Sequence, residues 1–326
     1  MTAPLLHVRN LSVTFPRGRQ SFKAVDDVSF DLGPTEALGL VGESGSGKTT
    51  IGRAVLRLLP FAERNVTGET DFHGRPLTAA KAAELKAFRA QAQMVFQDPV
   101  SSFNPRRRIE EIVAEGLRIQ GVGKTEIAER VDTALAEVGM SRSMVEGRRP
   151  HQFSGGQCQR IAIARALALR PEMLVCDEPV ASLDVSVQAR VLNLLRDMRR
   201  ARSLAMIFIS HDLAVVRSIC DRIAVLYMGR IVEIGDVRQI FERPAHPYTR
   251  TLLDAVPVPD ARAKVVPSPE RAVRASRLEE EGGCAFRTRC PFAQDICARV
   301  RPELATTPLG QQAACHFPLP AAAVPA

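Results

Sequence analysis

A glycine-rich run near residue 45 has the residue types and spacing of a phosphate-binding loop. Gly42-Glu43-Ser44-Gly45-Ser46-Gly47-Lys48-Thr49 fits the pattern G-x-x-x-x-G-K-[ST] at each fixed position, between a buried strand pattern and a helical pattern. Glycines let backbone N–H groups surround phosphate oxygens, and the following helix adds its positive end. Lys48 can neutralise β- and γ-phosphate charge, and the Thr49 hydroxyl can ligate Mg²⁺. The alternative, a Gly/Ser-rich turn before a helix, is disfavoured by the matching flanks, so we expect residues 42–50, Thr50 included, to bind ATP.

Two carboxylates follow an apolar run much further along the chain. Met173-Leu174-Val175-Cys176 leads directly into Asp177 and Glu178. Asp177 is placed to hold Mg²⁺ directly or through water, and Glu178 to polarise an attacking water as general base. An acidic turn after a strand is common, but its combination with the phosphate-binding loop favours the catalytic interpretation.

The elements that must position these residues alternate between strand and helix patterns. Leu5–Phe15 and Ala24–Leu32 predict an antiparallel layer near the N-terminus. Short apolar runs predict buried strands, helical patterns follow several of them, and such alternation favours a mainly parallel, helix-covered sheet. The predicted strands are 37–41, 93–96, 173–176, 205–209 and 223–226; the predicted helices are 49–59, 109–117, 124–138, 161–168 and 187–198.

Composition divides the chain near residue 244. More than half of the 22 prolines lie beyond residue 243, where they cannot donate to a helix or sheet ladder. We therefore predict an α/β domain over residues 1–243, with a helical insertion at about 98–160, and a loop-rich extension over 244–326. Within the extension, Val256–Ser276 has the composition of a linker.

Further motifs give the first domain a family resemblance. Ser154-Gly155-Gly156-Gln157 resembles the signature of ABC-type ATPases, and Gln97, Ser182-Leu183-Asp184 and Ile209-Ser210-His211-Asp212 are similar to the family's Q-loop, D-loop and switch loop. The resemblance implies a P-loop NTPase core with an antiparallel β layer and a helical subdomain. It also implies that Gln97 contacts Mg²⁺ or the attacking water, and that His211 holds the γ-phosphate and orients the water. In the family, the signature and Asp184 act at a nucleotide shared with a second ATPase subunit.

A narrower resemblance is to the ATP-binding subunits of dipeptide and oligopeptide importers, which include nickel and opine importers. It is carried by Phe96-Gln97-Asp98-Pro99, by 184–189, and by His246-Pro247-Tyr248-Thr249 and Arg289-Cys290-Pro291 in the extension; the chain is closer to the F-type subunit. The resemblance implies an ATPase at the cytoplasmic face of the inner membrane that powers peptide uptake. The implied partners are a second ATPase subunit, as a heterodimer or a homodimer, two permease subunits and an extracytoplasmic solute-binding protein.

Four cysteines in the extension form a candidate metal site. Cys284, Cys290, Cys297 and Cys315 lie close together in a proline-rich segment that has little capacity to stabilise itself by burial. The N-terminus shows no export signal, so disulfides are disfavoured, and the spacings are wider than those of usual zinc sites. Four soft thiolates suit a [4Fe–4S] cluster, which some members of the resembled family carry there; Zn²⁺ and free thiols are the alternatives.

The overall charge does not point to a nucleic-acid partner. The formal net charge is +8, but the basic residues do not cluster, and only two tyrosines and no tryptophan are available for base stacking. No apolar run is long enough to span a bilayer. A soluble ABC ATPase acting on nucleic acid or the ribosome is the alternative function, and it usually needs tandem cassettes or a long coiled-coil insertion.

Overall fold

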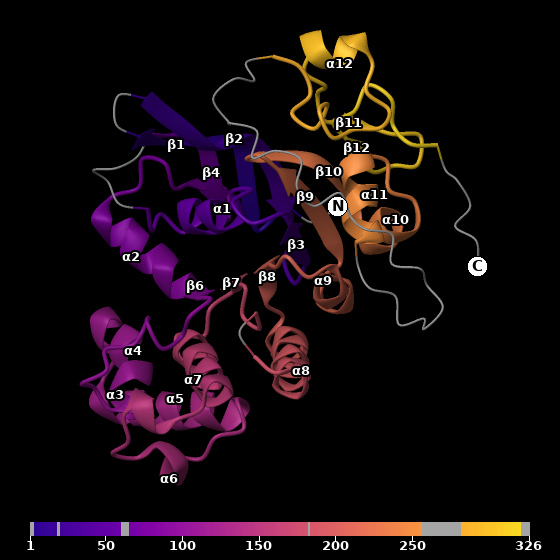
Figure 1. The fold of residues 1–326 in the computed structure, drawn as a ribbon. Helices are drawn as coiled ribbons and strands as arrows, with labels where there is room; N and C mark the ends of the chain where they lie inside the picture. The colour runs from indigo at the N-terminus through magenta and orange to yellow at the C-terminus, as the bar shows by residue number, and fades with distance from the viewer. Residues whose placement is uncertain (1–2, 18–19, 60–64, 182, 256–281, 321–326) are drawn as a thin grey trace.

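Two β-sheets form the framework of the chain. The computed structural model describes residues 3–17, 20–59, 65–181, 183–255 and 282–320 (Figure 1). The first sheet is antiparallel, which confirms the predicted N-terminal layer; its strands, in spatial order, are β2 (Gln20–Leu32), β1 (Leu6–Arg17), β4 (Asn65–Phe72) and β5 (Arg75–Pro76).

The second sheet has eight strands in the described residues, and the last five in spatial order are parallel. The predicted strands 37–41 and 205–209 are found at those bounds, because each is a continuous apolar run buried on both faces. The spatial order is β11 (Ala305–Thr306), β12 (Gln312–Ala313), β10 (Arg230–Asp236), β9 (Arg222–Tyr227), β3 (Ala37–Val41), β8 (Ala205–Ile209), β7 (Met173–Asp177) and β6 (Ala92–Val95).

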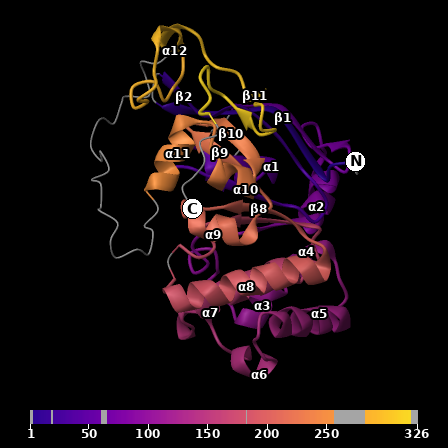
Figure 2. The ribbon, with the colours of Figure 1, turned by 90° about the vertical axis from the view of Figure 1, so that its right-hand side faces the viewer.

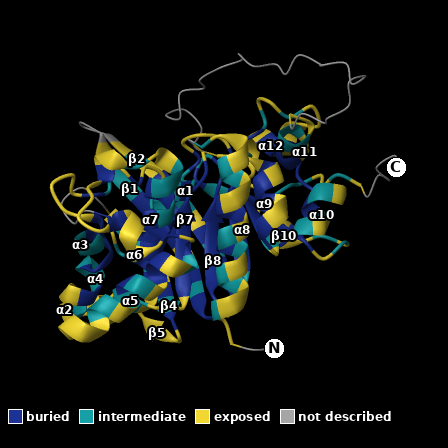
Figure 3. Cartoon of the chain, turned by 90° about the horizontal axis from the view of Figure 1, so that it is seen from below, coloured by how far each residue is buried: buried dark blue, intermediate teal, exposed yellow. Residues whose placement is uncertain are grey.

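Helices cover the second sheet on both faces. One apolar core lies between the antiparallel sheet, the first two helices and one face of the parallel sheet, and the other lies between the opposite face and later helices (Figures 1 and 2). The central strands β3, β7 and β8 are accordingly fully buried, as Figure 3 shows for β7 and β8. The α-helices are α1 (Lys48–Val55), α2 (Ala82–Gln91), α3 (Ile109–Val113), α4 (Glu115–Gln120), α5 (Lys124–Glu137), α6 (Arg142–Val145), α7 (Gly155–Leu167), α8 (Val185–Arg202), α9 (Leu213–Ile219), α10 (Val237–Glu242), α11 (Pro247–Asp254) and α12 (Asp295–Arg299).

Two helices differ from the sequence-based bounds for local reasons. The helix expected over 49–59 ends at Val55, and Arg57 beyond it has a left-handed backbone with φ of 55°. The single helix expected over 109–117 is two helices that meet at Ala114, whose ψ of −11° departs from the helical value. Gly116 follows this joint and packs so closely that an added Cβ would lie 2.8 Å from Leu169 Cδ1.

The C-terminal extension is attached to the main sheet. Its strand β12 pairs with β10, placing Ala313 opposite Glu233, and α11 lies beside α10 (Figure 1). Glu233 is fully buried and accepts hydrogen bonds from the backbone N–H groups of Ala245 (2.7 Å) and His246 (2.9 Å) and from Gln311 Nε2 (3.1 Å). The predicted linker at 256–276 lies outside the described residues. None of the described helices combines the length and hydropathy needed to cross a membrane.

Candidate active site

The carboxyl ends of four neighbouring parallel strands bring most of the predicted residues to one edge of the main sheet. β3 leads into the phosphate-binding loop, β6 into Gln97, β7 into Asp177 and Glu178, and β8 into His211. Side chains that follow parallel strands meet at the same edge, where open α/β sheets bind ligands. The structure thus brings these predicted residues together, as the strand pattern read from the sequence leads one to expect.

The predicted phosphate-binding loop, residues 42–49, contains glycines that no other residue could replace without strain. Gly42 has a φ of 149°, and a Cβ there would lie 2.2 Å from the carbonyl oxygen of Leu226. Gly47 has a φ of 100°, and a Cβ there would lie 2.5 Å from the carbonyl oxygen of Ala24, where α1 begins. Between them Ser46 is buried, whereas residues 43–45 are exposed. The loop thus turns its outer residues to solvent, where a phosphate can enter.

Lys48 is buried within this loop. Its Nζ donates to the carbonyl oxygens of Gly42 (2.7 Å) and Glu43 (2.9 Å). Burial lowers the pKa of Lys48, and the nearby carboxylates of Glu178 and Asp177 partly oppose that shift. The ammonium group is held inside the turn that is predicted to cradle phosphates.

Thr49, in the first turn of α1, is in direct contact with Asp177 at the end of β7. The Thr49 hydroxyl donates to Asp177 Oδ1 at 2.8 Å, and the Asp177 side chain is 1% exposed. Burial raises the pKa of Asp177, while the hydrogen bond from Thr49 and the charge of Arg53 act in the opposite direction. A hydroxyl and a buried carboxylate in contact form a fitting oxygen donor set for Mg²⁺.

Glu178, Gln97 and His211 form a second cluster at the same edge. Gln97 Nε2 donates to one carboxylate oxygen of Glu178 at 3.0 Å, and His211 Nδ1 pairs with the other at 3.2 Å. The Glu178 backbone is left-handed, with φ of 45°, and its N–H donates to the Ile209 carbonyl. Two residues far apart in sequence, Gln97 and His211, thus fix the Glu178 carboxylate from both sides.

The signature residues lie elsewhere on the molecule. Ser154 is exposed at the beginning of α7, where its Oγ and the Gln157 side chain form a capping box, and Gly155 and Gly156 open the helix. The phosphate-binding loop begins α1 in the upper part of Figure 1, whereas α7 belongs to the helical part below. The structure therefore does not bring these residues to the loop of the same chain.

Asp184 lies at the start of α8 and is also exposed. The α8 helix packs on the signature helix so closely that a Cβ at Gly156 would lie 2.4 Å from Val187 Cγ1. Of the D-loop residues, Ser182 lies outside the described residues.

Two residues of the extension contact the phosphate-binding loop, and sequence reasoning assigned neither to the site. Tyr248 Oη accepts a hydrogen bond from the Glu43 backbone N–H at 3.1 Å, and Arg289 donates to both Glu43 carboxylate oxygens at 2.8 and 3.0 Å. Both belong to sequence motifs of the extension that had been noted for their family likeness. Glu43 lies near the other end of the chain, so no local spacing could have identified it as their partner.

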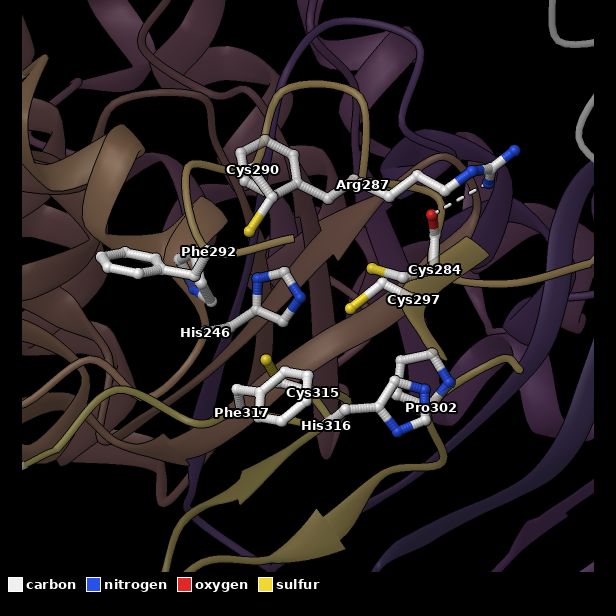
Figure 4. Close-up of a pocket in the computed structure, with 12 residues that line it drawn as sticks. His246, Cys284, Arg287, Cys290, Phe292, Cys297, Pro302, Cys315, His316 and Phe317 are labelled. Carbon is white, nitrogen blue, oxygen red and sulfur yellow. Dashed lines mark hydrogen bonds between the residues drawn. The ribbon is translucent and has the colours of Figure 1, made fainter. Parts of the chain in front are cut away.

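The four cysteines of the extension line one pocket. Figure 4 shows the sulfurs of Cys284, Cys290, Cys297 and Cys315 directed toward it, with the His246 ring among them. Burial raises the pKa values of Cys284 and Cys290, and that of Cys315 to about 11. The donor set fits a metal centre, but the cavity of about 10 Å³ holds no more than about one water-sized group. Within the described residues no group of three or more His, Cys, Asp or Glu side chains has the geometry of a metal site.

Comparison with known proteins shows likeness over nearly the whole chain. The ABC transporter family model matches residues 25–181, and the model of the oligopeptide/dipeptide transporter C-terminal region matches residues 232–297. A Brucella ovis protein that is inferred to be a peptide import ATP-binding protein is 49% identical over 313 residues, 96% of this chain and 97% of its own length. The oligopeptide transport ATP-binding protein OppF of Escherichia coli strain K12 is 45% identical over 319 residues, 92% of each chain.

Solved structures share the fold of the larger part of the chain. The dimeric post-hydrolysis ATP-binding cassette MJ0796 bound to ADP and Pi has a TM-score of 0.64 at 26% identity, covering 72% of this chain and 99% of that one. The cassette cbiO1 from Clostridium perfringens, part of the ABC transporter complex cbiONQ, has a TM-score of 0.64 at 25% identity over 74% of this chain and 91% of its own. The likeness is thus to ATP-binding cassettes.

Proposed function

The chain belongs to the ATP-binding subunits of ABC-type peptide importers, and we propose that ATP is bound and hydrolysed where its four parallel strands end. The observation that carries this assignment is the convergence of the phosphate-binding loop, Asp177, Glu178, Gln97 and His211 at one sheet edge. The relatives give no support to the alternative of an ATPase acting on nucleic acid or the ribosome.

ATP binding is assigned to the loop of residues 42–50. The start of α1, next to the exposed residues 43–45, provides an anion site, and Lys48 adds a positive charge. Thr49, Asp177 and Gln97 are the residues that would hold Mg²⁺, which neutralises phosphate charge when bound. In this structure Lys48 holds its own loop carbonyls, and phosphate oxygens would compete for its protons.

Hydrolysis is assigned to Glu178 as general base, with His211 and Gln97 fixing it. Each carboxylate oxygen of Glu178 has two lone pairs, of which the present contacts use one, so a water molecule can still donate a hydrogen bond to it. A rigidly held carboxylate accepts the proton of the attacking water without first reorganising. We also assign His211, whose side chain is exposed, to contact with the γ-phosphate.

A second ATPase subunit would complete the site. Ser154, Gly155 and Gly156 lie at the start of α7, and the N-terminus of a helix favours the binding of an anion. Because they lie away from the loop of their own chain, we infer that they and Asp184 face the nucleotide held by a partner ATPase, in a homodimer or a heterodimer.

The remaining partners follow from the kind of transport. An ATPase subunit of a peptide importer supplies energy to a pore that other subunits form, and the likeness to OppF supports that arrangement here. We therefore infer two permease subunits that form the pore and an extracytoplasmic protein that delivers the solute. We place the chain peripherally at the cytoplasmic face of the inner membrane, and assign dipeptides or oligopeptides as the imported solutes.

The general-base assignment is tested with Glu178→Gln. This variant keeps Mg–ATP binding and slows hydrolysis by about 10²- to 10⁴-fold, the usual contribution of a general base. Glu172→Gln is the matched control, because Glu172 precedes the same strand at its opposite end and its carboxylate pairs only with surface groups. Unchanged turnover in Glu178→Gln, measured as phosphate release at saturating ATP, would exclude Glu178 as the base.

We further propose that the four cysteines are the ligands of a metal centre, [4Fe–4S] or Zn²⁺, with a structural role. The support is the common pocket toward which all four sulfurs point. Iron, sulfide and zinc are measured on anaerobically purified protein, together with the visible spectrum. Cys290→Ser should lower the metal content, whereas the control Cys220→Ser, buried outside the pocket, should not. Wild-type protein without iron or zinc would refute the proposal.

A further inference from the structure

The C-terminal extension contacts the phosphate-binding loop at Glu43. Its backbone N–H donates to Tyr248 Oη at 3.1 Å, and its carboxylate receives two parallel hydrogen bonds from the Arg289 guanidinium, at 2.8 and 3.0 Å. The main chain and the side chain of one loop residue are thus fixed by two different segments of the extension. A bidentate arginine contact restricts orientation as well as distance.

Both holding residues are themselves fixed. Tyr248 is fully buried, with its ring 4.6 Å from that of Tyr227 and 5.3 Å from that of Phe286. The Arg289 guanidinium lies over the rings of Tyr227 and Phe286, 5.9 and 5.6 Å from their centroids, in cation–π geometry. Hydrogen bonding to Glu43 raises the pKa of Arg289 above its ordinary value. The guanidinium is therefore supported by buried aromatic rings, while the Arg289–Glu43 ion pair itself is partly exposed.

The held residue is directly connected to the phosphate-binding groups. The carbonyl oxygen of Glu43 accepts from Lys48 Nζ at 2.9 Å and from the Ser46 backbone N–H at 3.1 Å. A shift of Glu43 would therefore move the lysine and the turn that present charge and N–H groups to phosphate. Such small displacements of preorganised groups weaken binding, because the loop must then be ordered at the expense of binding energy.

We propose that Arg289 and Tyr248 are positioning residues of the ATP site, which hold the phosphate-binding loop in its binding conformation through Glu43. This inference rests on the proposed function and deepens it, since it assigns to the extension a part in nucleotide affinity. The two residues do not touch the nucleotide; they act through the loop.

A simple electrostatic effect predicts a different outcome. If Arg289 and Glu43 acted only by their charges, removing the cation would weaken ATP binding and removing the anion would strengthen it. If they act as a positioning pair, removing either partner frees the loop, and both changes weaken binding. The signs of two single substitutions therefore separate the explanations.

The experiment measures the affinity for a fluorescent ATP analogue with Mg²⁺, and the KM and kcat of hydrolysis, in the full-length protein. Arg289→Gln and Glu43→Gln should each weaken binding about two- to fivefold, the range expected for a partly exposed bidentate pair. The double variant should match the single ones, and Tyr248→Phe should weaken binding without any change of charge. Arg250→Gln is the matched control, because Arg250 pairs with Asp254 on the surface of the same extension. In Arg289→Gln and Tyr248→Phe, the kcat at saturating ATP should stay within about twofold of wild type, since neither residue touches the nucleotide or the base.

Any other result refutes either the positioning role of Arg289 and Tyr248 or the proposed ATPase function. Stronger binding by Glu43→Gln together with near-wild-type binding by the double variant would show a charge effect and refute the positioning role. Equal affinities in all variants would refute it too. Failure of the wild-type protein to bind the analogue would instead refute the proposed function, so the two failures are distinguishable.

Discussion

The packing of α7, the helix that begins with the signature glycines, against α8 predicts how Gly156→Ala changes the stability of the protein. Whether the substitution destabilises or stabilises the protein depends on the neighbouring side chain of Val187. A Cβ at Gly156 would lie 2.4 Å from Val187 Cγ1, whereas unstrained carbon atoms approach to about 3.5–4.0 Å. Val187 cannot turn aside easily, because a β-branched side chain in a helix has one strongly preferred rotamer. Gly156→Ala must therefore push the two helices apart by about 1 Å.

The magnitude follows from two opposing effects. Overpacking of this kind costs about 1–3 kcal/mol, while replacing glycine by alanine in a helix gains up to about 1 kcal/mol. Gly156→Ala alone should therefore destabilise the protein by about 1 kcal/mol. In a Val187→Ala background the clash is gone and only the helix gain remains, so the same substitution should stabilise it. The coupling energy of the cycle is the overpacking cost itself.

The assay is urea unfolding of the four proteins of the cycle, followed by ATP hydrolysis in each. Gly155→Ala is the control, because a Cβ there would meet only Leu183 Cδ2 at 3.8 Å, an ordinary contact. Hydrolysis lost in Gly156→Ala should return in the double variant, since the backbone N–H is retained. An effect of Gly156→Ala that is the same in both backgrounds would refute the packing argument.

Two further predictions concern buried groups. Asp177→Asn should raise the Mg²⁺ concentration needed for half-maximal hydrolysis, and an unchanged Mg²⁺ dependence would exclude Asp177 as a ligand. The same substitution should leave the thermal stability of the nucleotide-free protein equal or higher, because burial raises the pKa of Asp177 and so disfavours its charged form. Burial raises the pKa of Cys176 to about 12, so this thiol should resist alkylation in the native protein at pH 8 and should react once urea unfolds the chain. Peptide mass mapping measures the labelling, and rapid labelling of the native protein would contradict the burial of Cys176.

The sequence could predict which edge of the main sheet carries the candidate catalytic and phosphate-binding residues. Strands such as 37–41 and 205–209 are continuous apolar runs, and the candidate site residues follow them directly. A local sequence pattern therefore shows both the strand and the residues at its end. The contacts of Glu178 with Gln97 and His211 could be expected only through the family resemblance. The signature glycines were expected to face a second subunit, and their distance from the loop of their own chain is consistent with that.

The extension could not be predicted in the same way. The strand Gln312–Ala313 has two residues and no periodicity, and it forms only because β10 offers a free edge. Glu233, an acid in an apolar strand, would be read as a surface residue, yet it is fully buried because three donors of the extension surround it. Such long-range pairings depend on the tertiary fold and leave no local pattern in the sequence.

The attachment of the extension explains why it can influence the ATP site. It is anchored through Glu233 at residues 245–246 and 311–313, and it contacts Glu43 between these anchors. The turn from Cys284 to Cys290 carries two ligands of the proposed metal centre and also Arg289, and the backbone N–H of Arg289 donates to the Phe286 carbonyl within that turn. A metal centre that ordered Cys284 and Cys290 would therefore also order the Arg289 guanidinium, which contacts the phosphate-binding loop. A role in ordering this turn, rather than in electron transfer, is the one that the contacts of the cysteine pocket support.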